Sequence, residues 1–127
     1  MDHRFSKHYT LEEARALLPQ VRSWLEALST LRHELERFDK RLNNLMHPGR
    51  DVGGDTVNQW IRTLADMQAV LGEFQQREIQ IKDLERGLVD FPAIIGEREV
   101  FLCWEQDEDD IEFWHDLDSG FSGRERL

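Results

Sequence analysis

The chain has 127 residues, which is enough for one domain with its own core. Apolar residues make up 39% and charged residues 33%, a balance typical of long helices with solvated faces. The net charge is −10, and residues 87–127 contain three Lys or Arg against twelve Asp or Glu. Such an acidic segment repels phosphate backbones, and no basic stripe precedes it, so we expect no nucleic-acid binding.

Cysteine content and hydropathy indicate where the protein is found. The one cysteine, Cys103, cannot form an intrachain disulfide, which fits a reducing compartment. The first nine residues lack the apolar stretch of a signal peptide, and no apolar run approaches the roughly 20 residues that span a bilayer. We therefore expect a cytoplasmic protein that does not associate with membranes.

A long helical segment is predicted near the N-terminus. Thr10 and Glu13 have the spacing of a capping box, in which each side chain bonds the other's backbone N–H. Pro19 lacks an N–H and clashes with the carbonyl of Arg15, which predicts a short helix over 10–18 and a kink. The long helix then runs from Pro19 to about Met46. Two apolar seams repeat every seven residues: Ala14, Val21, Leu28, Leu35, Leu42 and Leu17, Trp24, Leu31, Phe38, Leu45.

A second long helix is predicted after a loop over 47–55, which contains the breaker cluster from His47 to Gly54. We expect this helix to reach about Arg86 and to stop at Gly87. Its apolar seams are Val57, Leu64, Leu71 and Trp60, Met67, Phe74, Ile81. Two helices of similar length joined by a short loop predict an antiparallel hairpin over 10–86.

After Gly87 the apolar period changes from helical spacing to alternation, which is typical of strands. The predicted strands are 88–91, ended by Pro92, then 99–104 and 111–115, with a polar loop over 105–110 between the last two. The tail over 119–124 is rich in glycine and reads as loop. We predict an α+β, mainly α, single domain over 1–127, with a small antiparallel β-meander of two or three strands over 87–127.

Several ordered blocks of the sequence resemble the bacterial domain-of-unknown-function family 2203. The blocks are Thr10–Ala14, Leu17–Pro19, Lys82–Leu84, Gly87–Ala93, Leu102–Trp104, Phe113–His115 and Gly120–Arg124. The resemblance covers nearly the whole chain and implies one undivided domain, but no activity, because the family has none assigned. The family pattern has a Gly-Glu pair after the Cys-Trp block, where this chain has Asp107-Glu108, which implies a differently shaped hairpin turn.

Four residues of the C-terminal third form a candidate ligand site: Asp90, Cys103, His115 and Arg124. Asp90 stands between apolar neighbours, so its carboxylate must find a partner or shift its pKa. Arg124 or Lys82 could be that partner. Asp90 belongs either to a structural ion pair, which we favour, or to a small anion or metal site where the hairpin meets the β unit.

The same region offers weaker candidates for metal binding and catalysis. His115 with Asp116 and Asp118 supplies zinc-ligand types, but their spacing fits no zinc motif, so a histidine bonded beside the core is the favoured reading. Cys103 could be a nucleophile with His115 as its base, although a small buried hydrophobe is the simpler role. The acidic run from Asp107 to Asp110 lacks calcium-loop spacing and is expected to be a solvated loop. We predict no cofactor.

The helical seams carry side chains too bulky for one hairpin to cover. The candidates for a dimer seam are Trp24, Leu31, Phe38, Trp60, Met67 and Phe74, which the β unit, a second copy or both must cover. Our leading hypothesis is a non-enzymatic scaffold or interaction protein that homodimerises through the hairpin and could bind an unidentified protein partner. The alternative is a small-ligand or metal-binding protein, or an enzyme, with its site at the junction of hairpin and β unit.

Overall fold

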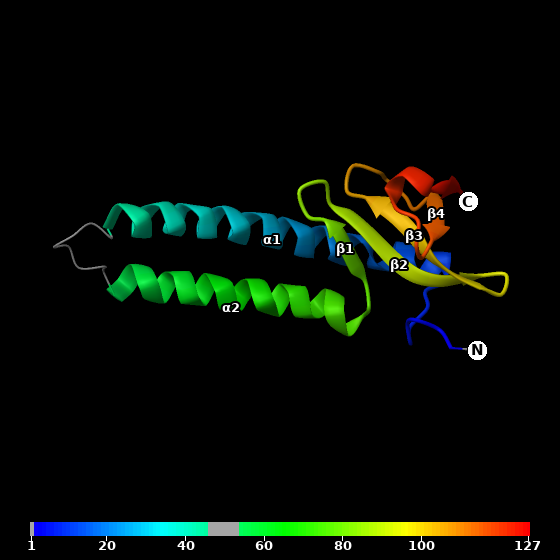
Figure 1. The fold of residues 1–127 in the computed structure, drawn as a ribbon, viewed down its shortest axis with the longest axis horizontal. Coiled ribbons are helices and arrows are strands. Elements are labelled where there is room, and N and C mark those ends of the chain that lie inside the picture. The colour runs from blue at the N-terminus through cyan, green and yellow to red at the C-terminus, as the bar shows by residue number, and fades with distance from the viewer. Residues whose placement is uncertain (1, 46–53) are drawn as a thin grey trace.

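The computed structural model describes residues 2–45 and 54–127, and it confirms the α+β architecture. Helices α1 (Leu11–Leu45) and α2 (Gly54–Gln76) lie side by side as an antiparallel hairpin, and a sheet packs against one end of it (Figure 1). Most of the predicted loop over 47–55 lies outside the described residues. No helix among those described is long and apolar enough to cross a membrane.

The sheet is a five-stranded antiparallel meander, in which each strand pairs with the next one along the chain. The sequence predicted two or three strands, and the first and last strands of the sheet are not among them. Its elements are β1 (Gln80–Asp83), β2 (Leu88–Ile95), β3 (Arg98–Glu105), β4 (Phe113–Asp116) and β5 (Glu125–Arg126), with a 3-10 turn, η1, over Phe121–Gly123.

Helix α1 begins with the predicted capping box and is continuous through Pro19, so the predicted break into two helices is wrong. The backbone N–H of Thr10 donates to Glu13 at 3.0 Å, and that of Glu13 donates to the Thr10 hydroxyl at 3.1 Å. Pro19 lies on the exposed side of the helix, where water can bond the carbonyl that it leaves free. Leu18 and Val21 are buried on the other side and hold the helix against the core.

Helix α2 ends at Gln76, so the predicted continuation to Arg86 is wrong. The N–H of Ile79 donates back to the carbonyl of Phe74 at 3.0 Å, and Glu78 has a φ of 58°. These features form a Schellman cap, whose left-handed position is most often a glycine. Because a glutamate occupies it here, the sequence carries no visible stop signal.

The residues that follow form a β-hairpin instead of helix. Gly87 does not stop a helix but closes the turn between β1 and β2, with a φ of 65°. Its backbone N–H donates to the carbonyl of Leu84 at 3.2 Å. A Cβ atom at Gly87 would lie 2.5 Å from Gln106, so a side chain has no room there.

Strand β2 runs through Pro92 to Ile95, although Pro92 was predicted to end it. A proline cannot donate to a neighbouring strand. It is tolerated because β1 pairs with β2 only as far as Asp90, so no donor is required at Pro92 on that side. The carbonyl of Pro92 instead accepts the N–H of Tyr9 at 2.7 Å.

The sheet packs one face on the helices, which leaves an outer face turned away from them. Alternation in β3 is as predicted: Val100, Leu102 and Trp104 join the core, and Phe101 and Cys103 take the opposite face. Strand β4 begins at Phe113, because the preceding loop extends through 112 and turns Ile111 into the core. The predicted strand over 111–115 therefore starts two residues too early.

The predicted dimer seam divides between two environments. Trp24 and Phe74 meet edge to face with ring centroids 5.4 Å apart, and Met67 packs against the same core. Leu31, Phe38 and Trp60 are only half-buried. One end of the hairpin extends beyond the sheet (Figure 1). The β unit therefore covers the aromatic residues nearest to it. The core consists of Tyr9, Ala14, Leu18, Val21, Leu25, Leu28, Phe74, Ile79, Val89, Phe91, Ala93, Val100, Leu102, Trp104 and Ile111.

Candidate functional site

The outer face of the sheet holds a polar cluster contributed by three adjacent strands. Asp90 of β2 lies opposite Cys103 of β3, and His115 of β4 lies opposite Phe101 of β3. Since side chains alternate along a strand, this register places all three polar side chains on one face. The Sγ atom of Cys103, a carboxylate oxygen of Asp90 and a ring nitrogen of His115 all lie within 4.8 Å of one another.

These three side chains are buried, although two of them are polar groups that normally stay in water. The exposed fractions are 1% for Asp90, 0% for Cys103 and 3% for His115. A buried polar group costs free energy unless it is hydrogen-bonded. Three of the four predicted site residues therefore meet in an environment where each must have a partner.

The direct partner of Asp90 is His115, not Arg124 or Lys82 as predicted. The Nε2 atom of His115 lies 2.9 Å from Oδ2 of Asp90, and its Nδ1 atom lies 2.7 Å from the carbonyl oxygen of Asp116. Because a carbonyl can only accept, Nδ1 carries a hydrogen. The contact between Nε2 and Oδ2 then requires one shared proton, either on the imidazole or on the carboxyl group.

The second carboxylate oxygen of Asp90 has a different environment. Oδ1 is inaccessible to solvent and accepts no N–H or O–H bond from the residues that the structure describes. The Cys103 thiol also contacts the Asp90 carboxyl group, but a thiol is only a weak donor. An unsatisfied buried acceptor costs about 1–3 kcal/mol, so this oxygen is a costly feature of the fold.

The protonation of the cluster argues against nucleophilic catalysis by Cys103. Burial raises the pKa of the Cys103 thiol to about 12; the charge of Asp90 adds to this rise, and Arg124 opposes it. Burial also raises the pKa of Asp90, while His115, Cys103 and Lys82 act in the opposite direction. Both ring nitrogens of His115 are already bonded. The thiol is therefore protonated and has no free base beside it, which a nucleophilic cysteine needs.

A pocket of about 220 Å³, here named the outer-face pocket, opens beside the cluster. The pairing register of β1 with β2 shifts between Ile81 and Asp83, and Lys82 lies at this shift on the pocket wall. The lining residues are Lys82, Leu88, Asp90, Cys103, His115, Leu117, Asp118, Ser119, Gly120 and Phe121.

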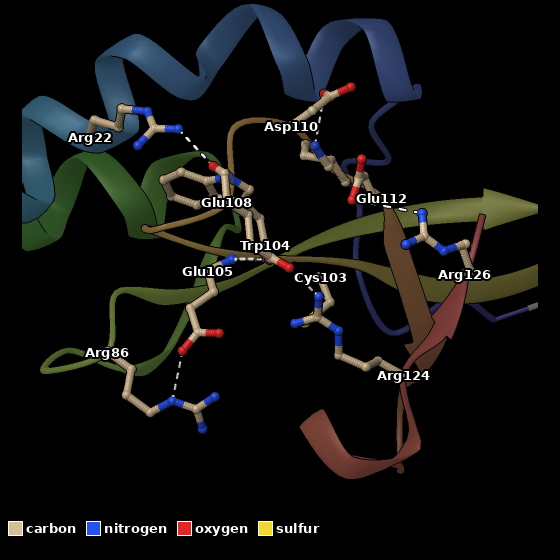
Figure 2. Close-up of polar contacts among 11 residues, drawn as sticks. Arg22, Arg86, Cys103, Trp104, Glu105, Glu108, Asp110, Glu112, Arg124 and Arg126 are labelled. Carbon is tan, nitrogen blue, oxygen red and sulfur yellow. Dashed lines mark hydrogen bonds and ion pairs between the residues drawn. The ribbon is translucent and has the colours of Figure 1, made fainter.

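Arg124, the fourth predicted site residue, approaches the cluster from the C-terminal segment. One of its nitrogens lies 4.0 Å from the Cys103 sulfur, and Figure 2 shows the guanidinium directed at that residue. The same guanidinium is ion-paired with Glu108 and lies 3.6 Å from the ring centroid of Phe113. The structure therefore places Arg124 beside the thiol, and Glu108 holds it there.

The two acids proposed as companions of His115 in a metal site do not join it. The carboxylate of Asp116 is ion-paired with Arg98, and only its backbone carbonyl contacts His115. Asp118 lies on the pocket wall, where its largely exposed carboxylate pairs with Arg4 at 2.9 Å. The carboxylate that does approach His115 is Asp90, which is distant in sequence but adjacent in the sheet.

The acidic loop after β3 is more ordered than the predicted solvated loop (Figure 2). Arg22 of α1 donates to the carbonyls of Gln106 at 2.7 Å and Glu108 at 2.8 Å, and its guanidinium lies over the Trp104 ring. The Trp104 indole also donates to the Glu108 carbonyl, at 2.9 Å. Asp107 is exposed, as predicted. Spacing could not reveal these contacts, because helix and loop are more than 80 residues apart.

A second group of possible metal ligands, His3, His8 and Glu99, lies where the N-terminal segment meets the sheet. Glu99 accepts the backbone N–H groups of Arg4 at 2.7 Å and Phe5 at 3.0 Å, and His8 lies 2.7 Å from it. Burial alone would raise the pKa of Glu99, but these bonds lower it to about 2. Glu99 therefore anchors the N-terminal segment to the sheet, and its bonds to Arg4, Phe5 and His8 are here named the clasp. The sequence did not suggest this role.

Comparison with known proteins places this fold and site in a family. Residues 7–127 match the family described as uncharacterized conserved protein, DUF2203. The chain belongs to this family. The match spans the hairpin, the sheet and all three buried residues of the outer-face cluster, and it confirms the resemblance seen in the sequence blocks. No curated protein and no solved structure matched the chain.

Proposed function

We propose that this DUF2203 protein binds a small ligand in the outer-face pocket. The observation that carries the proposal is the wall of that pocket, where buried Asp90, Cys103 and His115 converge and one carboxylate oxygen lacks a donor. A pocket with a few convergent polar groups of perturbed pKa is the usual form of a binding site. A purely structural ion pair would account for the contact between Asp90 and His115, but not for the unsatisfied oxygen or the pocket.

The size and charge of the pocket limit the ligand. Its volume of about 220 Å³ is below the range of about 300–1,000 Å³ typical of drug-sized ligands. Lys82 adds a cation to a wall that also holds the two acids Asp90 and Asp118. The ligand class that suits this space is a metal ion with its waters or a small anion. We also propose a cytoplasmic location, which suits a chain whose one cysteine is unpaired.

Self-association through the hairpin is a second proposal, and a separate observation favours it. Ile61 of α2 is 52% exposed, on a hairpin whose Leu31, Phe38 and Trp60 are only half-buried. An apolar stripe on two helices is the surface that pairs hairpins into four-helix bundles. A homodimer, or a complex with another protein, would cover these side chains.

Ligand binding is tested by native mass spectrometry of untagged protein purified without denaturation. The informative variant is Gly120→Leu, because Gly120 lines the pocket and a Cβ placed there meets no atom within 4 Å. Its side chain should enter the pocket without disturbing the fold. Ser122→Leu, on the exposed η1 turn and outside the pocket, is the matched control.

We expect wild-type protein and Ser122→Leu to carry the same added mass, and Gly120→Leu to lose whatever part of that mass occupies the pocket space. The same three proteins are then screened for thermal stabilisation by divalent metals and small anions. Wild-type protein with no added mass and no stabilisation by any of these compounds would refute the proposal. So would an added mass that is not a metal ion and that Gly120→Leu retains in full.

A further inference from the structure

We propose that Asp90, Cys103 and His115 together bind a zinc ion, with the fourth coordination position facing the outer-face pocket. The inference rests on the proposed ligand-binding function and names the ligand. It is drawn from the donor set, the separation of the donor atoms, the hydrogen bond behind the histidine, and the unsatisfied oxygen of Asp90.

The donor set is a thiol, an imidazole and a carboxylate, which are the three ligand types that zinc takes in proteins. Zinc–ligand bonds of about 2.0–2.3 Å place tetrahedral donors about 3.3–3.7 Å apart. The donor atoms here lie within 4.8 Å of one another, and the pair from His115 and Asp90 lies at 2.9 Å. Small side-chain rotations would bring all three to coordination distance.

His115 is already oriented as a metal ligand. A ligating histidine almost always donates its other ring N–H to a carbonyl or carboxylate, which fixes the tautomer. Nδ1 of His115 makes this bond to the Asp116 carbonyl at 2.7 Å, so Nε2, the atom that faces Asp90, is the one that would bind a metal after giving up the shared proton. The backbone of β4 therefore supplies the outer contact that a zinc site requires.

Zinc would also remove the energetic cost found at Asp90. The ion would replace the proton shared by Asp90 and His115 and the proton of the Cys103 thiol, so two protons leave as one ion binds. The site would then contain one dication and two anionic ligands, with no net charge in its buried interior. Arg124 lies 4.0 Å from the sulfur and would stabilise the thiolate. The carboxylate oxygen that has no donor would gain a cationic neighbour.

The sulfur ligand discriminates among cations. Magnesium and calcium prefer all-oxygen coordination, so a site with a thiolate and an imidazole selects a softer transition metal. Three protein ligands leave one tetrahedral position, and sites with an open position bind water or a substrate there. The outer-face pocket, with Lys82 and Gly120 on its wall, is the space into which that position would open.

The test uses the full chain after a chelator has removed bound metal. Zinc affinity is measured by competition with a chromophoric chelator, and cobalt(II) is added separately as a spectroscopic probe. We expect one ion per chain, a thiolate-to-cobalt charge-transfer band, and intense visible bands of four-coordinate cobalt. Cys103→Ser preserves the side-chain volume, and it should abolish the charge-transfer band. It should also weaken zinc binding by more than about 100-fold, since losing even an outer contact costs about 10- to 100-fold.

The control is His3→Ala, which removes a donor from the other possible ligand group, His3, His8 and Glu99. Zinc affinity should be unchanged in this variant. Zinc binding that survives Cys103→Ser, or that His3→Ala abolishes, would overturn the inference. A bound mass that is not a metal and that Gly120→Leu removes would also refute zinc, while leaving the ligand-binding proposal intact. Absence of any ligand would refute both.

Discussion

The donors around each carboxylate determine what that residue does in this protein. Glu99 receives two backbone N–H groups and lies beside His8, and its pKa falls to about 2. Asp90 is bonded through one oxygen to His115, and burial raises its pKa. Glu99 is therefore suited to a permanent anchoring role, whereas Asp90 is suited to exchanging a proton for another positive group.

The clasp at Glu99 predicts a pH dependence of stability. Its pKa is lowered in the folded state from an ordinary value of 4.5 to about 2. The stability that it contributes is therefore complete above about pH 4.5 and is lost as the pH falls toward 2. We expect the backbone N–H signals of Arg4 and Phe5 to titrate with a midpoint near pH 2 in NMR spectra, because both donate to this carboxylate.

Glu99→Gln should flatten the plot of unfolding free energy against pH between 4.5 and 2. Glu97→Gln should leave this plot unchanged, since Glu97 is exposed in the turn between β2 and β3. A midpoint of 4.5 for the Arg4 and Phe5 signals would show that the clasp does not form in solution.

At the scale of elements, the contact between α1 and the acidic loop fixes how the sheet sits on the hairpin. Arg22 is the residue that makes it, through two carbonyl bonds and the face of Trp104. The guanidinium donates to both carbonyls at once because its planar fork presents several N–H groups. This contact joins the first helix to the loop before β4, the strand that carries His115.

We predict that Arg22→Ala lowers the free energy of unfolding by about 2 kcal/mol, since a hydrogen bond to a charged group contributes about 1.5–3 kcal/mol. Arg22→Lys should restore less than half of this loss, because an ammonium group cannot reproduce the fork. Urea denaturation measures the free energy of unfolding of the two variants. Arg126→Ala is the control, because Arg126 is exposed and its nearest carboxylate oxygen is 3.8 Å away (Figure 2). Equal effects of the alanine changes at 22 and 126 would contradict this role for Arg22.

Elements with a local signal were predictable from the sequence, and elements without one were not. The capping box at Thr10 and the alternation of β3 depend on residues close together in the chain, so their spacing reveals them. The end of α2 depends on a left-handed glutamate, Glu78, in place of the usual glycine. Pro92 predicts a strand stop as long as the short length of β1 is unknown.

In the candidate site, too, the sequence predicted the residues but not how they come together. Residue types were enough to select Asp90, Cys103 and His115, since polar groups among apolar neighbours are unusual. Their convergence depends on the strand register, because Asp90 lies 25 residues from His115 in the chain. Asp116 and Asp118 were chosen for their closeness in sequence to His115, and alternation along β4 turns the Asp116 carboxylate toward Arg98 instead.

At the scale of the whole molecule, the sheet covers only one end of the hairpin (Figure 1). We predict a homodimer through the uncovered part, seen in light scattering at tens of micromolar as twice the mass of one chain. Ile61→Glu should convert it to monomer, because a charge at this exposed position cannot be buried without cost. Ile95→Glu, at an exposed position at the end of β2, is the matched control and should remain dimeric. Wild-type protein that is monomeric at this concentration would refute the prediction.

The N-terminal segment has a consequence for solubility that follows from the bond between Tyr9 and Pro92. An uncovered strand edge is a template on which other chains can add, and such addition leads to aggregation. Along β2 beyond Asp90, the edge has a proline with no N–H, and the N–H of Tyr9 occupies its carbonyl. The phenol of Tyr9 also donates to the Arg77 carbonyl at 2.8 Å, which ties this cover to the hairpin. The segment around Tyr9 therefore protects this edge of the sheet, and a chain without that segment would expose a strand edge that favours fibrous self-assembly.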